Sequence, residues 1–452
     1  MVKVRFEWMW TPGGWVRDRV LRVSNGAITS VSEPEANDAT KRHAGYVLPG
    51  LTSLHSHAFQ RGMAGLAETR GTGPESFWTW REVMYGFLDR LTPDDVRDIA
   101  AMAYVEMAER GFTSAVEFHY LHHDVDGRPY ANRAAMAEAI VEAARDAGIG
   151  LTLLPTLYRF GGFGGVAPGH GQRRFINSPD DFEALVAASS HAIRAHDDAR
   201  LGLALHSLRA VEPADIARAM RMLDGAPLHI HAAEQKKEVA DCIAWSGRRP
   251  VRWLLDTVGL DARWCVIHAT HMDADETRDL AETGAVAGLC PVTEANLGDG
   301  IFPATAFVDA GGAFGIGTDS NVLISAGEEL RTLEYGQRLR DCQRVRLAAA
   351  GQSVGARLYA EALAGGARAS GRVVGRLERG ARADWIALDE TDPVLAGARE
   401  ETILDRAVFA APTLPIKDVW IGGRRVVRHG RHVRRDTIGR RFAATMARLT
   451  AQ

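Results

Sequence analysis

Both ends of the chain alternate apolar and polar residues with the two-residue period of β-strands. Residues 2–10 show this pattern first, and Asn25 and Gly26 then form a dipeptide typical of a tight hairpin turn. Near the other end, Gly422 and Gly423 indicate a second hairpin. The β-patterned segments of the carboxyl-terminal end are 375–377, 383–388 and 419–427. We expect the two ends to pair with each other as one small domain.

The long middle of the chain alternates short apolar runs with longer stretches that have the period of an α-helix. Two helical stretches begin with the same signal, a capping Thr92 or Ser178 followed by proline and two aspartates. Residues 129–148 form another helical stretch, which ends at a glycine. The expected strands are 48–57, 113–119, 149–158, 201–207, 227–231, 264–268, 285–290 and 313–317.

This alternation gives eight strand–helix units, which predict an α/β fold of the (β/α)8 TIM-like barrel type. A doubly wound open sheet is the alternative, but no glycine-rich nucleotide-binding turn follows the first strand. We expect the barrel to span residues 48–370. Residues 1–47 and 371–452 then form a small β-sandwich domain built from both chain termini, with a terminal helix. The glycine-rich residues 160–176 are either a surface loop or a lid.

Composition narrows the possible partners. The 452-residue chain is 46% hydrophobic and 25% charged, which is ordinary for a globular enzyme, and its net charge of −3 gives no indication of a nucleic-acid partner. The four cysteines lack the paired spacing of metal sites, so we expect a reducing, cytoplasmic compartment. The first ten residues do not resemble a signal peptide, and no apolar run is long enough to span a bilayer.

Side chains that can bind a metal stand where the predicted barrel strands end. His55 and His57 are spaced i and i+2 at the end of the first strand, so both imidazoles face the same way. His231 ends the fifth strand, and Asp319 follows the eighth. Because catalytic groups of such barrels lie at the carboxyl ends of the strands, we expect these four residues to bind one divalent ion per chain, with Zn²⁺ as the first choice. Such an ion makes hydroxide available from bound water near neutral pH.

Each of these assignments has a competitor. His229 lies two residues before His231 and faces the same way, but His231 is nearer the strand end. His271 competes in the same manner with His268, which ends the sixth strand. The other interpretation of Asp319 is a helix cap or a salt-bridge partner. The coincidence of all these side chains at strand ends favours a metal site.

Taken together, these motifs resemble the amidohydrolase superfamily. The resemblance is carried by Pro49-Gly50-Leu51 with His55 and His57, by His231 with Glu234, by His268, by Asp319 and by residues 380–385. No lysine stands at the end of the fourth strand, where His206 is found instead. The resemblance therefore implies the one-metal branch of the superfamily, which contains mostly deaminases.

Within that branch the sequence is most similar to the formimidoylglutamate deiminase family. The stretches that carry this similarity are 57–65, 77–81, 117–123, 206–211 and 290–300. The resemblance implies a homodimeric enzyme of histidine degradation. Its reaction would be the metal-dependent hydrolytic deimination of N-formimino-L-glutamate to N-formyl-L-glutamate and ammonia.

Three residues are candidates for the proton transfers of such a reaction. We expect His268 and Asp319 to help remove a proton from the attacking water. We expect Glu234, in the loop after the fifth strand, to deliver a proton to the imino nitrogen.

The substrate that the resemblance implies is a small dicarboxylate. Arg81 and Arg209 are its expected carboxylate partners, because guanidinium groups bind carboxylates with two parallel hydrogen bonds. Arg209 follows His206 by three residues, whereas Arg81 is supported mainly by the resemblance. Gln60, Tyr120 and His206 are the expected hydrogen-bonding residues. The alternatives are surface salt bridges for the arginines, core packing for Tyr120 and a helix cap for Gln60.

Two other functions remain open from the sequence. A related deaminase of a purine, a pyrimidine or an adenosine derivative would share the metal centre and differ at the mouth of the barrel. Paired arginines argue against a neutral heterocycle. A non-catalytic barrel scaffold is the alternative from another class, and retention of all the expected metal-binding and proton-transfer residues argues against it.

Overall fold

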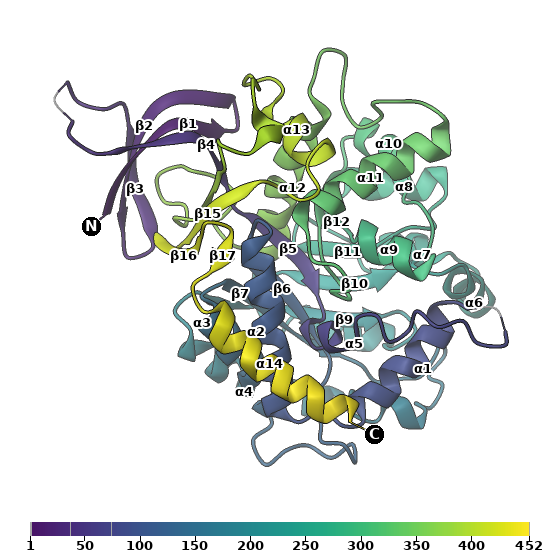
Figure 1. Ribbon diagram of the computed structural model, residues 1–452. Helices are drawn as coiled ribbons and strands as arrows, with labels where there is room; N and C mark the ends of the chain where they lie inside the picture. Colours follow the sequence, from purple (N-terminus) through teal and green to yellow (C-terminus); the bar gives the residue numbers. More distant parts are fainter. Residues whose placement is uncertain (1, 37, 74, 452) are drawn as a thin grey trace.

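The computed structural model describes residues 2–36, 38–73 and 75–451, and Figure 1 shows a barrel with a smaller sheet beside it. The outer limits of the expected small domain, residues 1 and 452, lie outside the described residues. Purple strands from the amino-terminal end lie beside yellow strands from the carboxyl-terminal end (Figure 1). The two chain ends therefore share one structural unit.

Within the described residues, eight parallel strands form the barrel, and each pairs with the next in chain order. They are β5 (Leu51–Ser56), β6 (Phe112–His119), β7 (Gly150–Leu157), β9 (Leu203–Ser207), β10 (Leu228–Ala232), β11 (Trp264–His268), β12 (Val286–Leu289) and β13 (Ala313–Ile316). A short extra strand, β8 (Ala199–Leu201), pairs with β7. A parallel bridge between Ser56 and Asp319 brings the last strand back to the first. The expected (β/α)8 barrel is confirmed.

The barrel strands are buried along most of their length because both faces of the sheet are covered. Every residue of β5, β6, β7, β10 and β11 is buried. Such strands read as continuous apolar runs in parallel sheets. Their few ionisable residues therefore stand out, and most of them, such as His55, His231 and His268, lie near the carboxyl ends.

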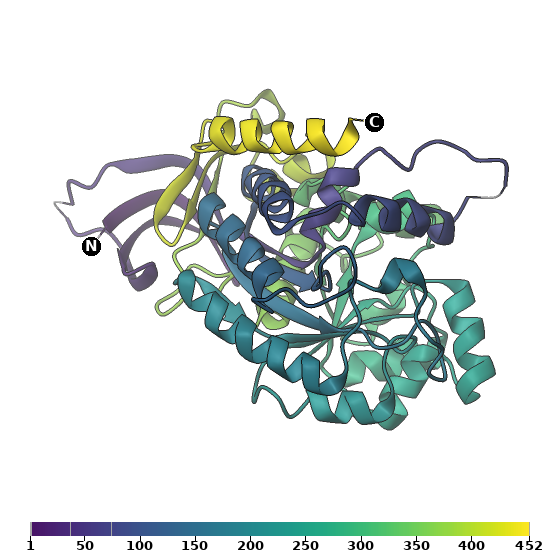
Figure 2. The same cartoon turned by 90° about the horizontal axis from the view of Figure 1, so that it is seen from below.

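Helices cover the outside of the barrel (Figures 1 and 2). They are α1 (Phe77–Leu88), α2 (Pro93–Glu109), α3 (Ala135–Ala147), α4 (Pro179–Ala192), α5 (Pro213–Ala219), α6 (Lys236–Ser246), α7 (Pro250–Thr257), α8 (Ala274–Glu282), α9 (Pro291–Leu297), α10 (Ala304–Asp309) and α11 (Ala326–Asp341). Thr92 and Ser178 cap α2 and α4 as expected, each accepting a hydrogen bond from a backbone N–H of the first turn.

The helix α12 (Val354–Ser370) packs against β5 and β13. Glycines permit this close approach, because a methyl group at Gly365 would overlap the carbonyl of Phe314 and one at Gly366 would lie 2.9 Å from Thr52 Cβ. Elsewhere, the short helix α13 (Ile403–Phe409) packs against α12, and α14 (Arg435–Thr450) packs against α2. Among the described helices, none combines the length and the apolarity needed to cross a membrane.

The small domain is one mixed sheet in the order β17-β16-β15-β14-β4-β1-β2-β3. Its strands are β1 (Val2–Thr11), β2 (Gly14–Ser24), β3 (Ala27–Ser32), β4 (Arg42–Pro49), β14 (Trp385–Leu388), β15 (Ile416–Ile421), β16 (Arg424–Arg428) and β17 (Arg431–His432). Both expected hairpin turns are present, with Asn25–Gly26 and Gly422–Gly423 in the left-handed region. A core that includes Phe6, Trp385 and Trp420 joins the two chain ends.

Two local expectations were wrong. The helix expected from residue 129 begins only at Ala135, because the side-chain oxygen of Asn132 accepts the backbone N–H of Ala134 and forms a turn instead. Residues 375–377 do not form a strand. Gly375 has a φ of +72°, a conformation that interrupts extended backbone.

Candidate active site

A cavity opens at the carboxyl end of the barrel, and the histidines and carboxylates expected from the sequence line one side of it. His57, His231, Glu234, His268 and Asp319 all contribute to its wall. Side chains from the first, fifth, sixth and eighth barrel strands therefore meet at one place, although they are spread over more than half of the chain.

Backbone hydrogen bonds hold the ends of β5 and β13 together at this point. The N–H groups of Thr318 and Asp319 both donate to the carbonyl of His55 at 3.0 Å, and the N–H of His57 donates to the carbonyl of Asp319 at 2.9 Å. As a result, Oδ1 of Asp319 lies 3.4 Å from His55 Nε2 and 3.5 Å from His57 Nε2. Two imidazoles and one carboxylate thus face a common centre.

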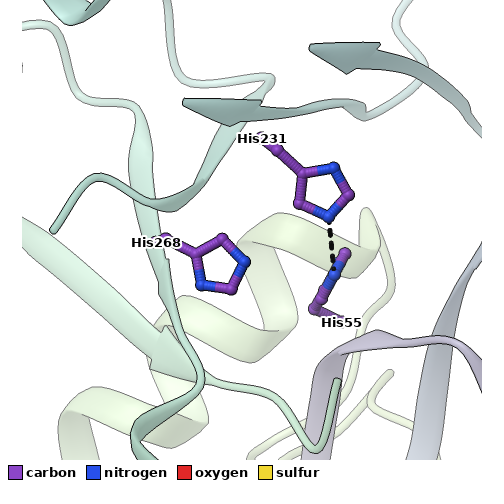
Figure 3. A group of neighbouring side chains, drawn as sticks. All are labelled: His55, His231 and His268. Atoms are coloured by element: carbon purple, nitrogen blue, oxygen red, sulfur yellow. Dashed lines mark hydrogen bonds between the residues drawn. The ribbon is translucent and has the colours of Figure 1, made fainter. Parts of the chain in front are cut away.

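His231 approaches His55 from β10 and forms with His55 and His268 a second, overlapping group of potential ligand atoms. Its Nε2 lies 3.1 Å from His55 Nε2, and Figure 3 shows the two rings pointing toward each other beside His268. The Nδ1–H groups of His57 and His231 donate to the carbonyls of Phe118 and His206, each at 2.8 Å. This assignment leaves the Nε2 lone pairs of both rings directed to the centre, which is the arrangement of metal-bound histidines.

The spacing and ionisation of these groups fit a single divalent ion. Four ligand atoms at about 2.1 Å from one ion in a tetrahedron would lie about 3.4 Å from each other. Burial lowers the pKa of His55 to about 3 and also lowers the pKa values of His57 and His231, so all three are neutral near pH 7. Burial opposes ionisation of Asp319, but the facing histidines lower its pKa overall.

The competing histidines lie elsewhere. His229 donates from Nε2 to the carbonyl of Ala369 in α12 at 2.8 Å, below the centre. His271 donates from Nε2 to the carbonyl of Asp299 at 2.8 Å. Neither belongs to the groups of neighbouring histidine, cysteine and acidic side chains found among the described residues.

The proton-transfer candidates surround His268. Its Nε2 lies 3.8 Å from Glu234 Oε1 and 3.9 Å from Asp319 Oδ2, and its Nδ1 lies 3.2 Å from Glu294 Oε1. Burial lowers the pKa of His268, but these carboxylates outweigh burial and raise it to about 10. Burial raises the pKa of Glu234 to about 7. A cationic imidazole therefore lies beside a carboxyl group that can exchange a proton near neutral pH.

The backbone is strained where these groups leave their strands. Ala233, His268 and Asp319 have φ values of +53°, +67° and +44°, in the left-handed region that residues other than glycine rarely adopt. Such conformations cost free energy and are concentrated at functional sites. Glu238 stabilises one of them, because its carboxylate accepts the N–H groups of Ala233 and Glu234 at 3.2 and 3.1 Å.

The expected substrate-binding residues line the rest of the cavity. Gln60 Nε2 donates to the hydroxyl of Tyr120 at 2.9 Å, and Gln60 does not cap a helix. The Tyr120 ring also packs against His57 and His206, so this residue packs in the cavity wall in addition to its hydrogen bond with Gln60. The Nδ1 of His206 lies 3.1 Å from the hydroxyl of Ser207.

Arg81 and Arg209 reach the same cavity from α1 and from the loop after β9. Within the described part of the chain, neither guanidinium has a hydrogen bond or a salt bridge, and the Nε atom of each is buried without a partner. Arg209 is 7% exposed. Burial opposes its charge, but the carboxylates of Glu238 and Glu234 raise the pKa of Arg209 overall. A buried unpaired cation is costly, so this face of the cavity is suited to an anionic ligand.

Comparison with known proteins agrees with this geometry. The model of the family described as "Amidohydrolase family" matches residues 46–426. The chain belongs to the amidohydrolase family. It is 51% identical to the formimidoylglutamate deiminase of Pseudomonas aeruginosa over 97% of each chain. It is 29% identical to the 5-methylthioadenosine/S-adenosylhomocysteine deaminase of Natronomonas pharaonis over 89% of this chain and 86% of that protein.

Solved structures show the same architecture. An amidohydrolase from Brucella melitensis superposes with a TM-score of 0.95 at 48% identity, and the match covers all of both chains. An adenosine deaminase from Xanthomonas campestris with bound zinc superposes with a TM-score of 0.80 at 22% identity over 99% and 98% of the two chains. At that identity the second likeness concerns the fold alone.

Three site residues of this amidohydrolase were not expected from the sequence. Glu238 and Glu294 bind groups of the cavity wall, and Cys290 lies with His268 and Asp319 in a group of potential ligand atoms. A signal exists for Glu238, which follows Glu234 by four residues at the start of α6. Glu294 lies one turn after Cys290 in α9, and its contact with His268 depends on the closed barrel.

Proposed function

We propose that this protein hydrolyses N-formimino-L-glutamate to N-formyl-L-glutamate and ammonia. One observation carries the proposal. The guanidinium groups of Arg81 and Arg209 form no salt bridge among the described residues, and they line the same cavity as the histidine and aspartate cluster. The substrate has two carboxylates for the arginines and one formimino group for the cluster. The 51% identity to a formimidoylglutamate deiminase supports the same substrate.

In this proposal His55, His57, His231 and Asp319 would hold one Zn²⁺ ion. When bound there, the ion would lower the pKa of a water molecule and so supply a nucleophile near neutral pH. The lowered pKa values of the histidines support this assignment, because neutral imidazoles offer their lone pairs.

The proton transfers would fall to residues beside this cluster. Asp319 would accept the proton of the water that adds to the formimino carbon, the cationic His268 beside it would stabilise the negative charge that develops on the water oxygen, and Glu234 would protonate the terminal nitrogen. Glu234, now a carboxylate, would take the remaining proton of the added oxygen and pass it to the same nitrogen, so that the carbon–nitrogen bond breaks and ammonia leaves; the proton held by Asp319 would then return to Glu234. The formyl product keeps the water oxygen. Gln60, Tyr120 and His206 would orient the substrate by hydrogen bonds.

We also propose that the enzyme is a cytoplasmic homodimer of histidine degradation. The resemblance to the formimidoylglutamate deiminase family supports all three statements. Light scattering of the purified protein tests the oligomeric state, and a single species of twice the 49.1 kDa chain mass is expected.

An assay of ammonia release tests the reaction. The zinc-loaded protein is compared on N-formimino-L-glutamate, guanine, cytosine and adenosine, before and after removal of the metal by a chelator. We expect turnover of the formimino compound alone, loss of turnover with the chelator and recovery with Zn²⁺. Turnover of a heterocycle in preference to the formimino compound would favour the deaminase alternative. No turnover of any substrate by zinc-loaded protein would favour the scaffold.

A further inference from the structure

One tryptophan outside the barrel strands lies beside three cationic side chains. The ring of Trp78 has the Arg81 guanidinium carbon 4.7 Å from its centroid, that of Arg209 at 5.6 Å, and Lys237 Nζ at 5.8 Å. These cations come from α1, from the loop after β9 and from α6, which are separate elements. Trp78 is therefore the point at which the three elements bring their positive charges together.

The helical geometry of α1 explains how Trp78 reaches both arginines. Phe77, Trp80, Arg81, Met84 and Tyr85 line the cavity, and their spacing places them on one face of the helix. Trp78 is half-buried at the edge of that face, three residues before Arg81, so the two side chains are neighbours on the helix surface. Its ring can then contact Arg209 from the facing loop.

Lys237 has a carboxylate partner, whereas the two arginines form no salt bridge among the described residues. Lys237 Nζ lies 2.6 Å from Asp241 Oδ2, one turn along α6. Arg81 and Arg209 form no such salt bridge within the described part of the chain, although Glu238 and Glu234 lie near enough to Arg209 to raise its pKa. The negative face of an indole attracts a cation without removing its hydrogen-bonding groups. A ring in this place can hold two guanidiniums near each other and leave their N–H groups free for a ligand.

We propose that Trp78 is a positioning residue that sets the directions of Arg81 and Arg209 for a ligand with two carboxylates. This role rests on the proposed function. It adds the residue that makes the site selective for dicarboxylates over monocarboxylates. Binding energy gained in this way is the same in the ground state and the transition state, so it acts on KM and not on kcat.

The test compares Trp78→Leu, which removes the ring, with Trp78→Phe, which keeps an aromatic face. Trp245→Leu is the matched control, because Trp245 is also half-buried but stacks on Phe163 and contacts no cation among the described residues. Each zinc-loaded variant is assayed for kcat and KM on N-formimino-L-glutamate. Calorimetry then measures Kd for glutarate, a dicarboxylate without a formimino group, and for butyrate. Circular dichroism and Tm establish that each variant is folded.

We expect Trp78→Leu to raise KM and the glutarate Kd about tenfold, with kcat within about threefold and a smaller change for butyrate. Trp78→Phe should fall between Trp78→Leu and the parent protein, and Trp245→Leu should match the parent. An unchanged glutarate Kd in folded Trp78→Leu would overturn the proposal. An equal loss for glutarate and butyrate, or a loss confined to kcat, would also overturn it.

The glutarate measurement separates this proposal from the proposed function. If the parent protein binds glutarate in a Trp78-dependent manner but does not release ammonia from N-formimino-L-glutamate, the reaction is wrong and the positioning role stands. If the parent protein releases ammonia and Trp78→Leu binds glutarate normally, the reaction stands and the positioning role is wrong. If Trp78→Leu does not fold, the same comparisons are made with Trp78→Phe.

Discussion

At the residue scale, Glu234 and His268 form a buried pair whose proton the surrounding charges can move. The carboxyl oxygen and the imidazole nitrogen are 3.8 Å apart, and burial raises the pKa of Glu234 to about 7. The negative charges of Asp319 and Glu238 also raise the pKa of Glu234, whereas the positive charge of His268 lowers it. The pair is therefore suited to giving and taking one proton around neutral pH.

Glu234→Gln should retain the metal and lose most of the turnover. The amide keeps the shape of the side chain but can neither give nor take a proton, so we expect kcat to fall about a thousandfold. Elemental analysis and the ammonia assay on the same sample measure both effects. Glu282→Gln, at an exposed position in α8, is the control. Turnover within tenfold of the parent protein would remove Glu234 from the proton transfer.

The sequence was sufficient to predict which residues at strand ends meet in the cavity. It was not sufficient to predict residues that reach the cavity wall from helices. His55, His57, His231 and Asp319 follow apolar runs, and the barrel geometry alone brings such positions together. Glu294 and Glu238 are glutamates in short helices, which is the ordinary composition of a helix start. Their partners, an imidazole and two backbone N–H groups, become apparent only when the chain is folded.

At the element scale, residues of the loop 160–176 and of the helix α1 pack against each other in the cavity wall. Gln172 Nε2 donates to the Tyr158 hydroxyl at 2.6 Å, and Phe175 packs against Tyr85 of α1. Tyr85, Tyr158 and Phe175 all line the cavity. The sequence predicted a glycine-rich loop here, but its partner could not be predicted, because α1 lies about eighty residues earlier.

A methyl group at one glycine tests whether this packing matters for binding. The added Cβ of Gly171→Ala would lie 2.7 Å from Tyr85 Cγ, so the loop or the Tyr85 ring, which lies beside Arg81, must shift. We expect KM for N-formimino-L-glutamate to rise about fivefold or more. Gly169→Ala is the matched control, because its Cβ would lie 3.8 Å from the nearest atom. Equal KM values for both variants would show that the contact has no role in binding.

At the scale of the whole molecule, the small sheet and the barrel meet around a few buried charges. Arg372 and Arg382 both form ion pairs with Asp198, next to the barrel strand β7. Asp384 lies beside them, and its carboxylate accepts the N–H of Gly422 at 2.7 Å. The joining of the two ends in one sheet could be predicted from their β patterns. The buried ion pairs at the junction could not be predicted, because each of these charged residues resembles an ordinary surface residue in the sequence.

Relative to the parent protein, the Asp384→Asn variant should gain free energy of unfolding as the pH rises. Burial and the nearby Asp198 raise the pKa of Asp384 from its ordinary 3.8 to about 7. The folded chain thus binds this proton more tightly than the unfolded chain, so the free energy of unfolding falls as pH rises between these two values. Between pH 5 and pH 8 the variant should gain about 2 to 3 kcal/mol on the parent protein.

Urea unfolding of both proteins at the two pH values measures this difference. The titration of the histidines affects both proteins equally, so it cancels in the comparison. Asp309→Asn, at an exposed position in α10, is the control and should show no pH-dependent gain. A gain for Asp384→Asn that is the same at both pH values would contradict the raised pKa.

Anomalous diffraction at the zinc edge, from crystals of zinc-loaded protein grown with glutarate, locates the metal and the two carboxylates in one measurement. We expect one strong peak per chain, bonded to His55, His57, His231 and Asp319, with the glutarate carboxylates on Arg81 and Arg209. A peak away from these four residues, or none in protein that releases ammonia from N-formimino-L-glutamate, would contradict this expectation.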